Sequence, residues 1–298
     1  MFCCILLSGG FSKRFRENSQ GVTDKALYKI DGEPMILRVY NKLREFCGPE
    51  NMILSVRNEK QIKEYSAYIH ENIIYALDEI EGGGPLIALY SALKHCRSKY
   101  VLALPNDMPF ISTNLLRDLI NVVSRDNYDI ASPMLSNSYV ESLVVSAQKN
   151  ILVDTLRLLV EKYNRKKVSD LHRSLPRVYF LNIEKHGYSY KELINVNREN
   201  DLFESKPPTK LVNDDITLNR EFSLMDVENF NLTKLDTSLW IGLLGKDFCK
   251  EYLYYMRKKI YYLAMQVIKD LLSEKKQYSE IINSIEQFFW IRSDNGLY

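Results

Sequence analysis

The sequence has no long apolar run, because no stretch reaches the roughly 18 consecutive apolar residues that a membrane-spanning helix needs. The apolar segment at residues 3–7 also lacks the preceding basic region and the small-residue cleavage site of a signal peptide. Hydrophobic residues make up 46% of the chain and charged residues 26%, which is ordinary for a globular protein. We therefore expect a cytoplasmic protein that has no membrane as a partner.

Cysteine and histidine are scarce and scattered. The five cysteines contain no C-x-x-C spacing, and the four histidines show no spacing typical of metal ligands. Cys3 and Cys4 lie inside a predicted buried strand, which is typical of reduced thiols and not of a disulfide framework. The sequence therefore argues against a disulfide-rich protein and against a structural zinc site.

A strong excess of charge of either sign is also missing. The 40 basic and 38 acidic residues leave a net charge of +2. Proteins that bind nucleic acid through its backbone usually carry a clustered basic excess. Nucleic acid is therefore not expected as a partner.

What the sequence does contain is a repeated alternation of strand-like and helix-like segments. Short apolar runs predict strands at residues 3–7, 52–56, 73–75, 100–104, 128–132, 143–145, 178–181 and 193–194, with Pro133 stopping the fifth. Amphipathic patterns predict helices at residues 34–48, 59–70, 86–93, 113–123 and 151–163. This order is typical of an α/β fold, a three-layer, mostly parallel Rossmann-like sheet of roughly seven or eight strands with helices on both faces.

The first predicted strand leads into a loop that suits a phosphate group. Gly9 and Gly10 follow the strand, and without a Cβ they let backbone N–H groups approach a phosphate closely. Lys13, Arg14 and Arg16 supply positive charge directly afterwards. The spacing matches neither the G-x-G-x-x-G nor the P-loop motif, so a plain strand-to-loop turn remains an alternative.

Asp107 lies at the end of another predicted strand, after Pro105 and Asn106. Ligands in this class of sheet bind outside the carboxyl ends of the strands, where the glycine loop and Asp107 are both expected. A carboxylate that faces phosphate groups suits Mg²⁺, which prefers oxygen ligands. We predict that Asp107 binds Mg²⁺, and a turn-forming aspartate is the structural alternative.

Further motifs follow the glycine loop in a fixed order. They are Asp24-Lys25-Ala26-Leu27, Asp31-Gly32-Glu33-Pro34-Met35-Ile36, Gly83-Gly84-Pro85-Leu86, Pro105-Asn106-Asp107-Met108-Pro109-Phe110 and Asn195-Val196-Asn197-Arg198-Glu199-Asn200-Asp201-Leu202. Together they resemble the molybdenum cofactor guanylyltransferase family, whose members are MobA-like nucleotidyltransferases. The resemblance covers about two-thirds of the chain.

The resemblance implies a magnesium-dependent nucleotidyltransferase. Its substrates would be GTP and the molybdopterin form of the molybdenum or tungsten cofactor, and pyrophosphate would be released. The resemblance makes Asp107 the metal ligand and gives Lys25 and Arg14 a catalytic role on the nucleotide phosphates. It assigns nucleotide or cofactor binding to Leu7, Ser8, Gly9, Gly10, Ser12, Asp78 and Asn197.

Each of these side chains also has a structural interpretation. Lys25 and Arg14 could be solvated surface cations, Asp78 a surface loop acid and Asn197 a turn residue. The chain also departs from the family pattern, with about seven extra residues between Arg14 and Asp24. Ala88 replaces an expected glycine, and Arg57-Asn58 stands where the family has Asn before Arg.

Three alternative functions therefore remain. The first keeps the chemistry but changes the substrates, as in cytidylyl transfer to the same cofactor or nucleotidyl transfer to a sugar phosphate. The second is a non-catalytic module that binds nucleotide or cofactor. The third, nucleic-acid binding, is disfavoured by the near-neutral charge.

The character of the sequence changes at Pro207-Pro208, which we interpret as a linker. We predict a nucleotidyltransferase domain at residues 1–206 and a small helical extension at residues 207–298. Apolar positions within 248–272 and within 281–289 each follow one helical face, so a hairpin of two helices that turns at residues 273–276 is expected. These helices would pack on the main domain, form a homo-oligomer or dock a cofactor-receiving enzyme.

Overall fold

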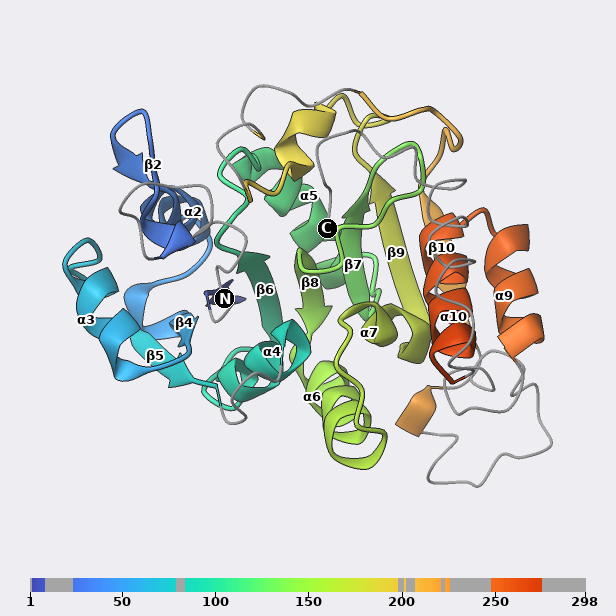
Figure 1. The fold of residues 1–298 in the computed structure, drawn as a ribbon, viewed down its shortest axis with the longest axis horizontal. Coiled ribbons are helices and arrows are strands. Elements are labelled where there is room, and N and C mark those ends of the chain that lie inside the picture. Colours follow the sequence, from blue (N-terminus) through green and yellow to red (C-terminus); the bar gives the residue numbers. More distant parts are fainter. Residues whose placement is uncertain are drawn as a thin grey trace.

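One eight-stranded sheet forms the centre of the molecule (Figure 1). The computed structural model describes residues 2–8, 24–78, 84–197, 201, 207–220, 223–225 and 248–274. In sheet order the strands are β10 (Ile216–Asn219), β9 (Arg177–Asn182), β7 (Ile130–Met134), β8 (Val145–Gln148), β6 (Tyr100–Pro105), β1 (Phe2–Leu7), β4 (Met52–Val56) and β5 (Ile74–Leu77).

The sheet is mostly parallel, as the sequence predicts. β1 pairs in parallel with β4 and β6, β4 with β5, and β7 with β9. β8 runs antiparallel to both β6 and β7, and β10 runs antiparallel to β9. Successive side chains of β1 alternate between the faces, so that Cys3 and Ile5 join one core and Cys4 and Leu6 join the other. An apolar run therefore suits this strand, because both its faces are buried.

Helices cover both faces and complete the three predicted layers. One face carries α2 (Met35–Arg44), α3 (Glu59–Ser66) and α5 (Thr113–Ser124). The other carries α4 (Pro85–Leu93), α6 (Lys149–Arg157), α7 (Ser169–Ser174), α9 (Phe248–Arg257) and α10 (Tyr261–Glu274). The short elements are η1 (Lys25–Leu27), β2 (Lys29–Ile30), β3 (Glu33–Pro34), η2 (Pro49–Asn51), η3 (Leu158–Lys162, a π-helical turn) and η4 (Tyr190–Leu193).

The helix starts follow the local sequence. Asn58 caps α3 by accepting a hydrogen bond from the backbone N–H of Gln61, and Ser112 caps α5 by accepting one from Leu115. Such caps satisfy N–H groups that have no partner in the first turn of a helix. Pro34, predicted as the first residue of a helix, instead ends the short strand β3 and precedes α2.

Three predicted strands differ from the structure. The strand predicted at residues 143–145 is β8, which lies at Val145–Gln148. Pro133 lies inside β7 and does not stop it, because the pairing of β7 with β8 already ends at Ala131. Residues 193–194 do not form a strand, since the chain there follows the 3₁₀ turn η4. The polar residues before Leu193 allow Ser189 to cap that turn, so two apolar residues are insufficient for a strand.

The single helix predicted at residues 248–272 is also wrong. The structure divides it into α9 and α10, and Lys259 between them has a positive φ of 59°. That left-handed conformation breaks a helix, so a turn at residues 258–260 separates α9 from α10. The turn predicted at residues 273–276 extends beyond the described residues and stays a prediction. Leu253, expected on the apolar face, is 49% exposed. The second predicted helix, at residues 281–289, lies outside the described residues.

The described C-terminal residues pack on the main sheet. β10 extends the sheet beyond β9, and Tyr255 of α9 and Leu263 of α10 are buried in the core that also contains residues of β1 and β6. The expected packing on the main domain is therefore confirmed for these two helices. The domain division at Pro207 stays a prediction, although residues on both sides of it belong to one sheet.

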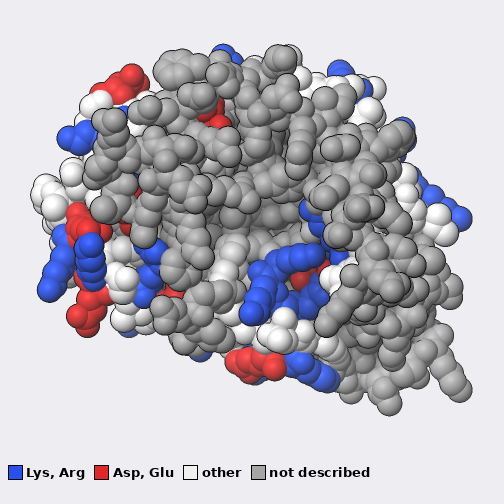
Figure 2. Space-filling model, in the orientation of Figure 1, with Lys and Arg blue, Asp and Glu red and all other residues white. Residues whose placement is uncertain are grey.

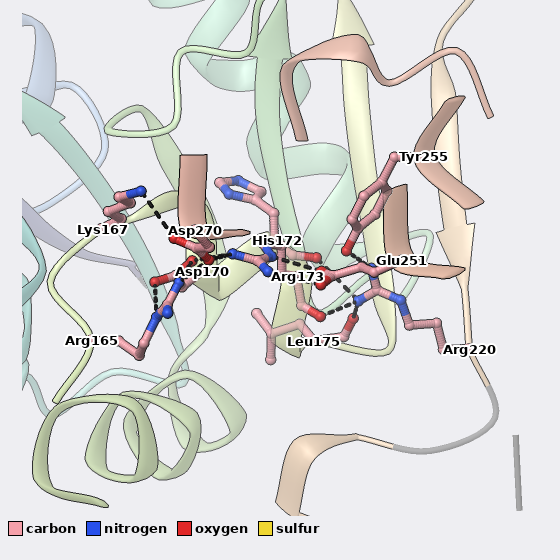
Figure 3. Close-up of polar contacts among 10 residues, drawn as sticks. All are labelled: Arg165, Lys167, Asp170, His172, Arg173, Leu175, Arg220, Glu251, Tyr255 and Asp270. Atoms are coloured by element: carbon pink, nitrogen blue, oxygen red, sulfur yellow. Dashed lines mark hydrogen bonds and ion pairs between the residues drawn. The ribbon is translucent and has the colours of Figure 1, made fainter. Parts of the chain in front are cut away.

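A buried ionic network holds α9 and α10 against α7 (Figure 3). Arg173 of α7 is fully buried, and its Nε and Nη2 donate to the two carboxylate oxygens of Glu251 on α9, at 2.7 and 2.8 Å. Its Nη1 contacts Asp170 of α7 and Asp270 of α10. Arg165 also pairs with both aspartates. The hairpin is thus fixed to the sheet layer by charge pairs as well as by apolar packing.

Arg220, directly after β10, adds a second tie in the same region (Figure 3). Its Nη1 donates to the backbone carbonyls of His172, Arg173 and Leu175, at 3.1, 3.0 and 2.6 Å. Its Nη2 donates to the hydroxyl of Tyr255 on α9 at 3.1 Å. One guanidinium therefore closes the carboxyl end of α7, where backbone carbonyls have no partner within the helix.

Candidate active site

The carboxyl ends of four neighbouring strands bring polar residues to one edge of the sheet. β6, β1, β4 and β5 are adjacent, and Leu7 lies beside Pro105 in the strand register. The N–H of Asn106 donates to the carbonyl of Leu7, and the N–H of Ser8 donates to the carbonyl of Ser55, both at 3.1 Å. Residues that follow these strands therefore meet at one edge, as the sequence predicts.

Lys25, Asp107 and Asn197 converge there. The Lys25 Nζ donates to Asp107 Oδ2 at 2.6 Å and to Asn197 Oδ1 at 2.7 Å. The side chains of Lys25 and Asp107 are mostly buried, with 13% and 18% of their surface exposed. The three residues are far apart in the sequence, so their meeting is a property of the fold and not of a local turn.

Backbone contacts hold the segment that carries Asn197. The N–H of Val196 donates to the carbonyl of Asp107 at 2.8 Å. The N–H of Asn197 donates to the carboxylate of Asp201 at 2.7 Å. The segment is therefore tied directly to the end of β6.

One carboxylate oxygen at this centre fits a metal. Asp107 Oδ1 is buried and makes no hydrogen bond to any of the described residues, whereas Oδ2 accepts from Lys25. A buried carboxylate oxygen without a donor is costly unless a cation or water satisfies it. The described residues contain no cluster of three or more His, Cys, Asp or Glu side chains that could hold a metal alone. A single aspartate at this centre fits Mg²⁺, which is often held by one or two carboxylates together with substrate phosphates.

A buried network fixes the backbone before Lys25. The carboxylate of Asp24 accepts hydrogen bonds from the Ala26 N–H at 3.0 Å, from Gln61 Nε2 at 2.7 Å and from the Tyr65 hydroxyl at 2.8 Å. Burial, followed by the charge of Asp24, raises the pKa of Tyr65, so this hydroxyl keeps its proton and remains a donor. Asp24 thereby caps η1 and holds Lys25 in place, a role that the Asp-Lys motif did not reveal.

Ser8 links that network to β6. Its Oγ donates to the Tyr65 hydroxyl at 2.9 Å and accepts from Asn106 Nδ2 at 2.6 Å. Ser8 is itself buried. Its side chain therefore connects the ends of β1 and β6, and its hydroxyl makes hydrogen bonds to protein groups. Leu7, the residue before it, is a buried strand residue.

Asp78 lies further along the same edge, at the end of β5. Its carboxylate accepts from the Ser55 hydroxyl at 3.0 Å, and its N–H donates to the carbonyl of Val56. Burial raises the pKa of Asp78, although Ser55 and Arg57 act in the opposite direction. In the sheet, β4 and β1 lie between β5, which Asp78 follows, and β6, which Asp107 follows.

Four of the predicted site residues, Gly9, Gly10, Ser12 and Arg14, lie outside the described residues.

Comparison with known proteins assigns the family. The family model described as MobA-like NTP transferase domain matches residues 4–177. A probable molybdenum cofactor guanylyltransferase from Pyrococcus horikoshii is 32% identical over 203 residues, which cover 66% of this chain and 95% of that protein. The chain belongs to the MobA-like NTP transferase family. It is accordingly a nucleotidyltransferase of the molybdenum cofactor guanylyltransferase type.

Other relatives agree with this assignment. The molybdenum cofactor guanylyltransferase of Shewanella putrefaciens is 27% identical over 163 residues, which cover 54% of this chain and 76% of that protein. The crystal structure of Archaeoglobus fulgidus molybdopterin-guanine dinucleotide biosynthesis protein A is similar at a TM-score of 0.53 and 22% identity, and covers 67% of this chain and 94% of that one. At this identity the similarity shows the fold alone. About a third of the present chain has no counterpart in the Pyrococcus and Archaeoglobus proteins.

Two residues near the centre formed by Lys25, Asp107 and Asn197 were not predicted from the sequence. Glu141 is buried and accepts a hydrogen bond from Asn195 Nδ2 at 2.7 Å. Burial raises the pKa of Glu141 to about 7, and the nearby charge of Asp107 adds to the effect of burial. Asn195 is the first asparagine of the Asn-x-Asn motif, of which only the second was assigned a role. A lone glutamate between Val140 and Ser142 carries no sequence signal of this kind.

Charged side chains of both signs lie on the described part of the face in Figure 2. On the face in Figure 2, Lys and Arg side chains lie among Asp and Glu, and the largest basic group surrounds acidic atoms. None of the described helices is long and apolar enough to cross a membrane.

Proposed function

We propose that this protein transfers GMP from GTP to the molybdopterin form of the molybdenum or tungsten cofactor. A phosphate oxygen of the cofactor forms a bond to the α-phosphorus of GTP. The bond from that phosphorus to the oxygen of the leaving pyrophosphate breaks, so atoms and charge balance without a covalent enzyme intermediate. A cytoplasmic location, a homo-oligomer and docking to a cofactor-receiving enzyme remain predictions.

The convergence of Lys25, Asp107 and Asn197 is the observation that carries the proposal. Both substrates are anionic, so a site that joins them has to offset their repulsion. A mostly buried ammonium is effective there, because Coulomb interactions are stronger away from bulk water. The relatives' names supply the identity of the two substrates.

The residues at this edge also fit Mg²⁺. Asp107 would hold the ion through Oδ1, the oxygen that has no described donor, with the amide oxygen of Asn197 close by. When bound, Mg²⁺ neutralises phosphate charge and orients the phosphate oxygens. Lys25 places its own positive charge on the nucleotide phosphates, and Asp24 holds the backbone that carries Lys25. The backbone N–H groups of the predicted glycine loop, with Arg14, would contribute further contacts.

Thermal unfolding in the presence of Mg²⁺ and one nucleotide at a time tests the proposal. A ligand at a hundredfold excess over its Kd stabilises the folded state by about 2.7 kcal/mol. We expect the largest rise in Tm with GTP, a smaller one with CTP, ATP and UTP, and loss of the GTP effect in Asp107→Ala. With molybdopterin added, GTP should then yield pyrophosphate.

Asp126→Ala is the matched control, because Asp126 is an exposed aspartate in the turn after α5. It should retain the GTP effect in full. A larger shift with CTP would contradict the guanine specificity and keep the reaction. No shift with any nucleotide, or equal loss in both variants, would contradict the proposed reaction itself.

A further inference from the structure

The start of α10 touches the loop between β7 and β8, residues 135–144. The backbone N–H of Tyr261 donates to Ser138 Oγ at 2.9 Å, and Ser138 is fully buried. The hydroxyls of Tyr262 and Ser142 lie 3.2 Å apart. The rings of Tyr262 and Tyr139 pack edge to face, with centroids 5.6 Å apart. These contacts hold the β7–β8 loop at three points.

Glu141 lies within that loop and faces the catalytic edge. Its backbone N–H donates to the carbonyl of Pro133 at 3.0 Å. Its carboxylate accepts from the Leu143 N–H at 3.2 Å and from the Tyr139 hydroxyl at 3.2 Å. Tyr139 is thus shared, because its ring contacts α10 and its hydroxyl contacts Glu141.

The same carboxylate holds the segment that carries Asn197. Glu141 Oε2 accepts from Asn195 Nδ2 at 2.7 Å. The next residue, Val196, donates its N–H to the carbonyl of Asp107, and Asn197 then contacts Lys25. A continuous set of contacts therefore runs from α10 to the Lys25, Asp107 and Asn197 centre.

This contact joins the matched domain to an element outside it. Residues 4–177 match the family model, and α10 lies wholly after them. The Pyrococcus relative is covered almost completely by 66% of this chain, so about a third of this chain is additional. An element beyond the matched domain thus contacts a loop inside it.

We propose that Glu141 is a positioning residue for the catalytic centre and that α10 keeps it in place through the β7–β8 loop. The additional C-terminal hairpin is then part of the machinery of the site and does more than stabilise the fold. The catalytic role of this centre rests on the proposed function, whereas the positioning of residues 195–197 does not.

Hydrogen exchange of the full chain without substrate tests the positioning directly. Glu141→Leu removes the acceptor of Asn195, so the Val196 amide should exchange at least about tenfold faster, because a lost buried hydrogen bond opens the segment locally. Glu141→Gln keeps an acceptor oxygen and should restore slow exchange. Tyr262→Phe, which loses the hydroxyl contact with Ser142, should show a smaller increase at the same amide.

Tyr255→Phe is the matched control. It makes the same chemical change on the neighbouring helix, at the hydroxyl that accepts from Arg220, away from the β7–β8 loop. It should leave exchange at Val196 unchanged relative to the natural chain. Equal exchange in Glu141→Leu and Glu141→Gln, or an equal increase in Tyr255→Phe and Tyr262→Phe, would overturn the proposal.

Turnover gives a second readout. In a chain that releases pyrophosphate, Glu141→Leu should lower kcat at least about tenfold with little change in the KM for the nucleotide, and Glu141→Gln should recover most of it. An inactive natural chain would count against the proposed function, while the exchange result would still decide the positioning role. Full kcat in a Glu141→Leu variant with fast exchange would remove the link to catalysis.

Discussion

Glu251→Leu is expected to destabilise the protein strongly, because it breaks the buried ionic network around α7. The network contains three cations and three carboxylates: Arg165, Lys167, Arg173, Asp170, Glu251 and Asp270. Its formal charges cancel in the natural chain. Loss of Glu251 leaves one excess positive charge and deprives the Nε and Nη2 groups of fully buried Arg173 of their acceptor.

The size of the effect follows from burial. Removal of one partner of a buried ion pair costs about 3–5 kcal/mol, whereas an exposed pair contributes about 0–1 kcal/mol. Each kcal/mol lowers the Tm of a domain of this size class by about 2–4 °C. We therefore expect a fall of about 6–20 °C for Glu251→Leu. In the double variant Arg173→Met with Glu251→Leu, two cations and two carboxylates remain, so the charges cancel again and much of the loss should be recovered.

Urea unfolding followed by circular dichroism, on the natural chain, both single variants and the double variant, measures this coupling. Asp154→Leu is the matched control, because Asp154 pairs with Arg157 at 3.7 Å on the surface of α6 and is 49% exposed. A Glu251→Leu effect as small as that of the control would refute the reasoning. So would a double variant whose loss equals the sum of the two single losses.

Three further outcomes are expected. Burial, followed by the charge of Arg220, lowers the pKa of His172 to about 3, below its value of about 6.5 in the unfolded chain. The free energy of unfolding should therefore be highest above pH 6.5 and decline as the pH falls toward 3, because the unfolded state binds a proton that folded His172 does not. In His172→Gln, urea unfolding should give a free energy that changes less with pH in this window, and a difference between the two chains that does not change with pH would contradict this. Lys25→Met should lower the kcat of pyrophosphate release by about 10²–10³-fold with a small change in Tm, and an equal loss in exposed Lys29→Met would oppose the assigned role. Ser112→Ala should cost about 1 kcal/mol in urea unfolding through the lost cap of α5, and an unchanged midpoint would show that the cap is unimportant.

The sheet could be predicted because its signals are local. The apolar runs at residues 3–7, 52–56 and 100–104 become β1, β4 and β6, and their carboxyl ends meet as parallel strands must. Asp107, Lys25 and Asn197 could be proposed as partners from ordered motifs. Their direct contacts then follow from the fold.

The remainder could not be predicted because it depends on distant partners. Glu141 has no motif, and its contact with Asn195 joins residues 54 positions apart in the sequence. Arg173 and Glu251 are 78 positions apart, so the sequence gives no sign that either charge is buried. The break between α9 and α10 depends on the positive φ of Lys259, a conformation that lysine rarely adopts and that its neighbours do not signal.

The central place of β1 in the sheet sets the order in which its strand pairings can form during synthesis. This strand is synthesised before both of its partners, β4 and β6, and Phe2 lies beside Tyr100 in the register. Parallel pairing across such a distance is slow, because a long loop has to close before any contact stabilises it. β1 must therefore lack its partner on one side until β6 has been synthesised. An apolar strand in that state is a target for chaperones during translation, well before the chain contains a complete nucleotide site.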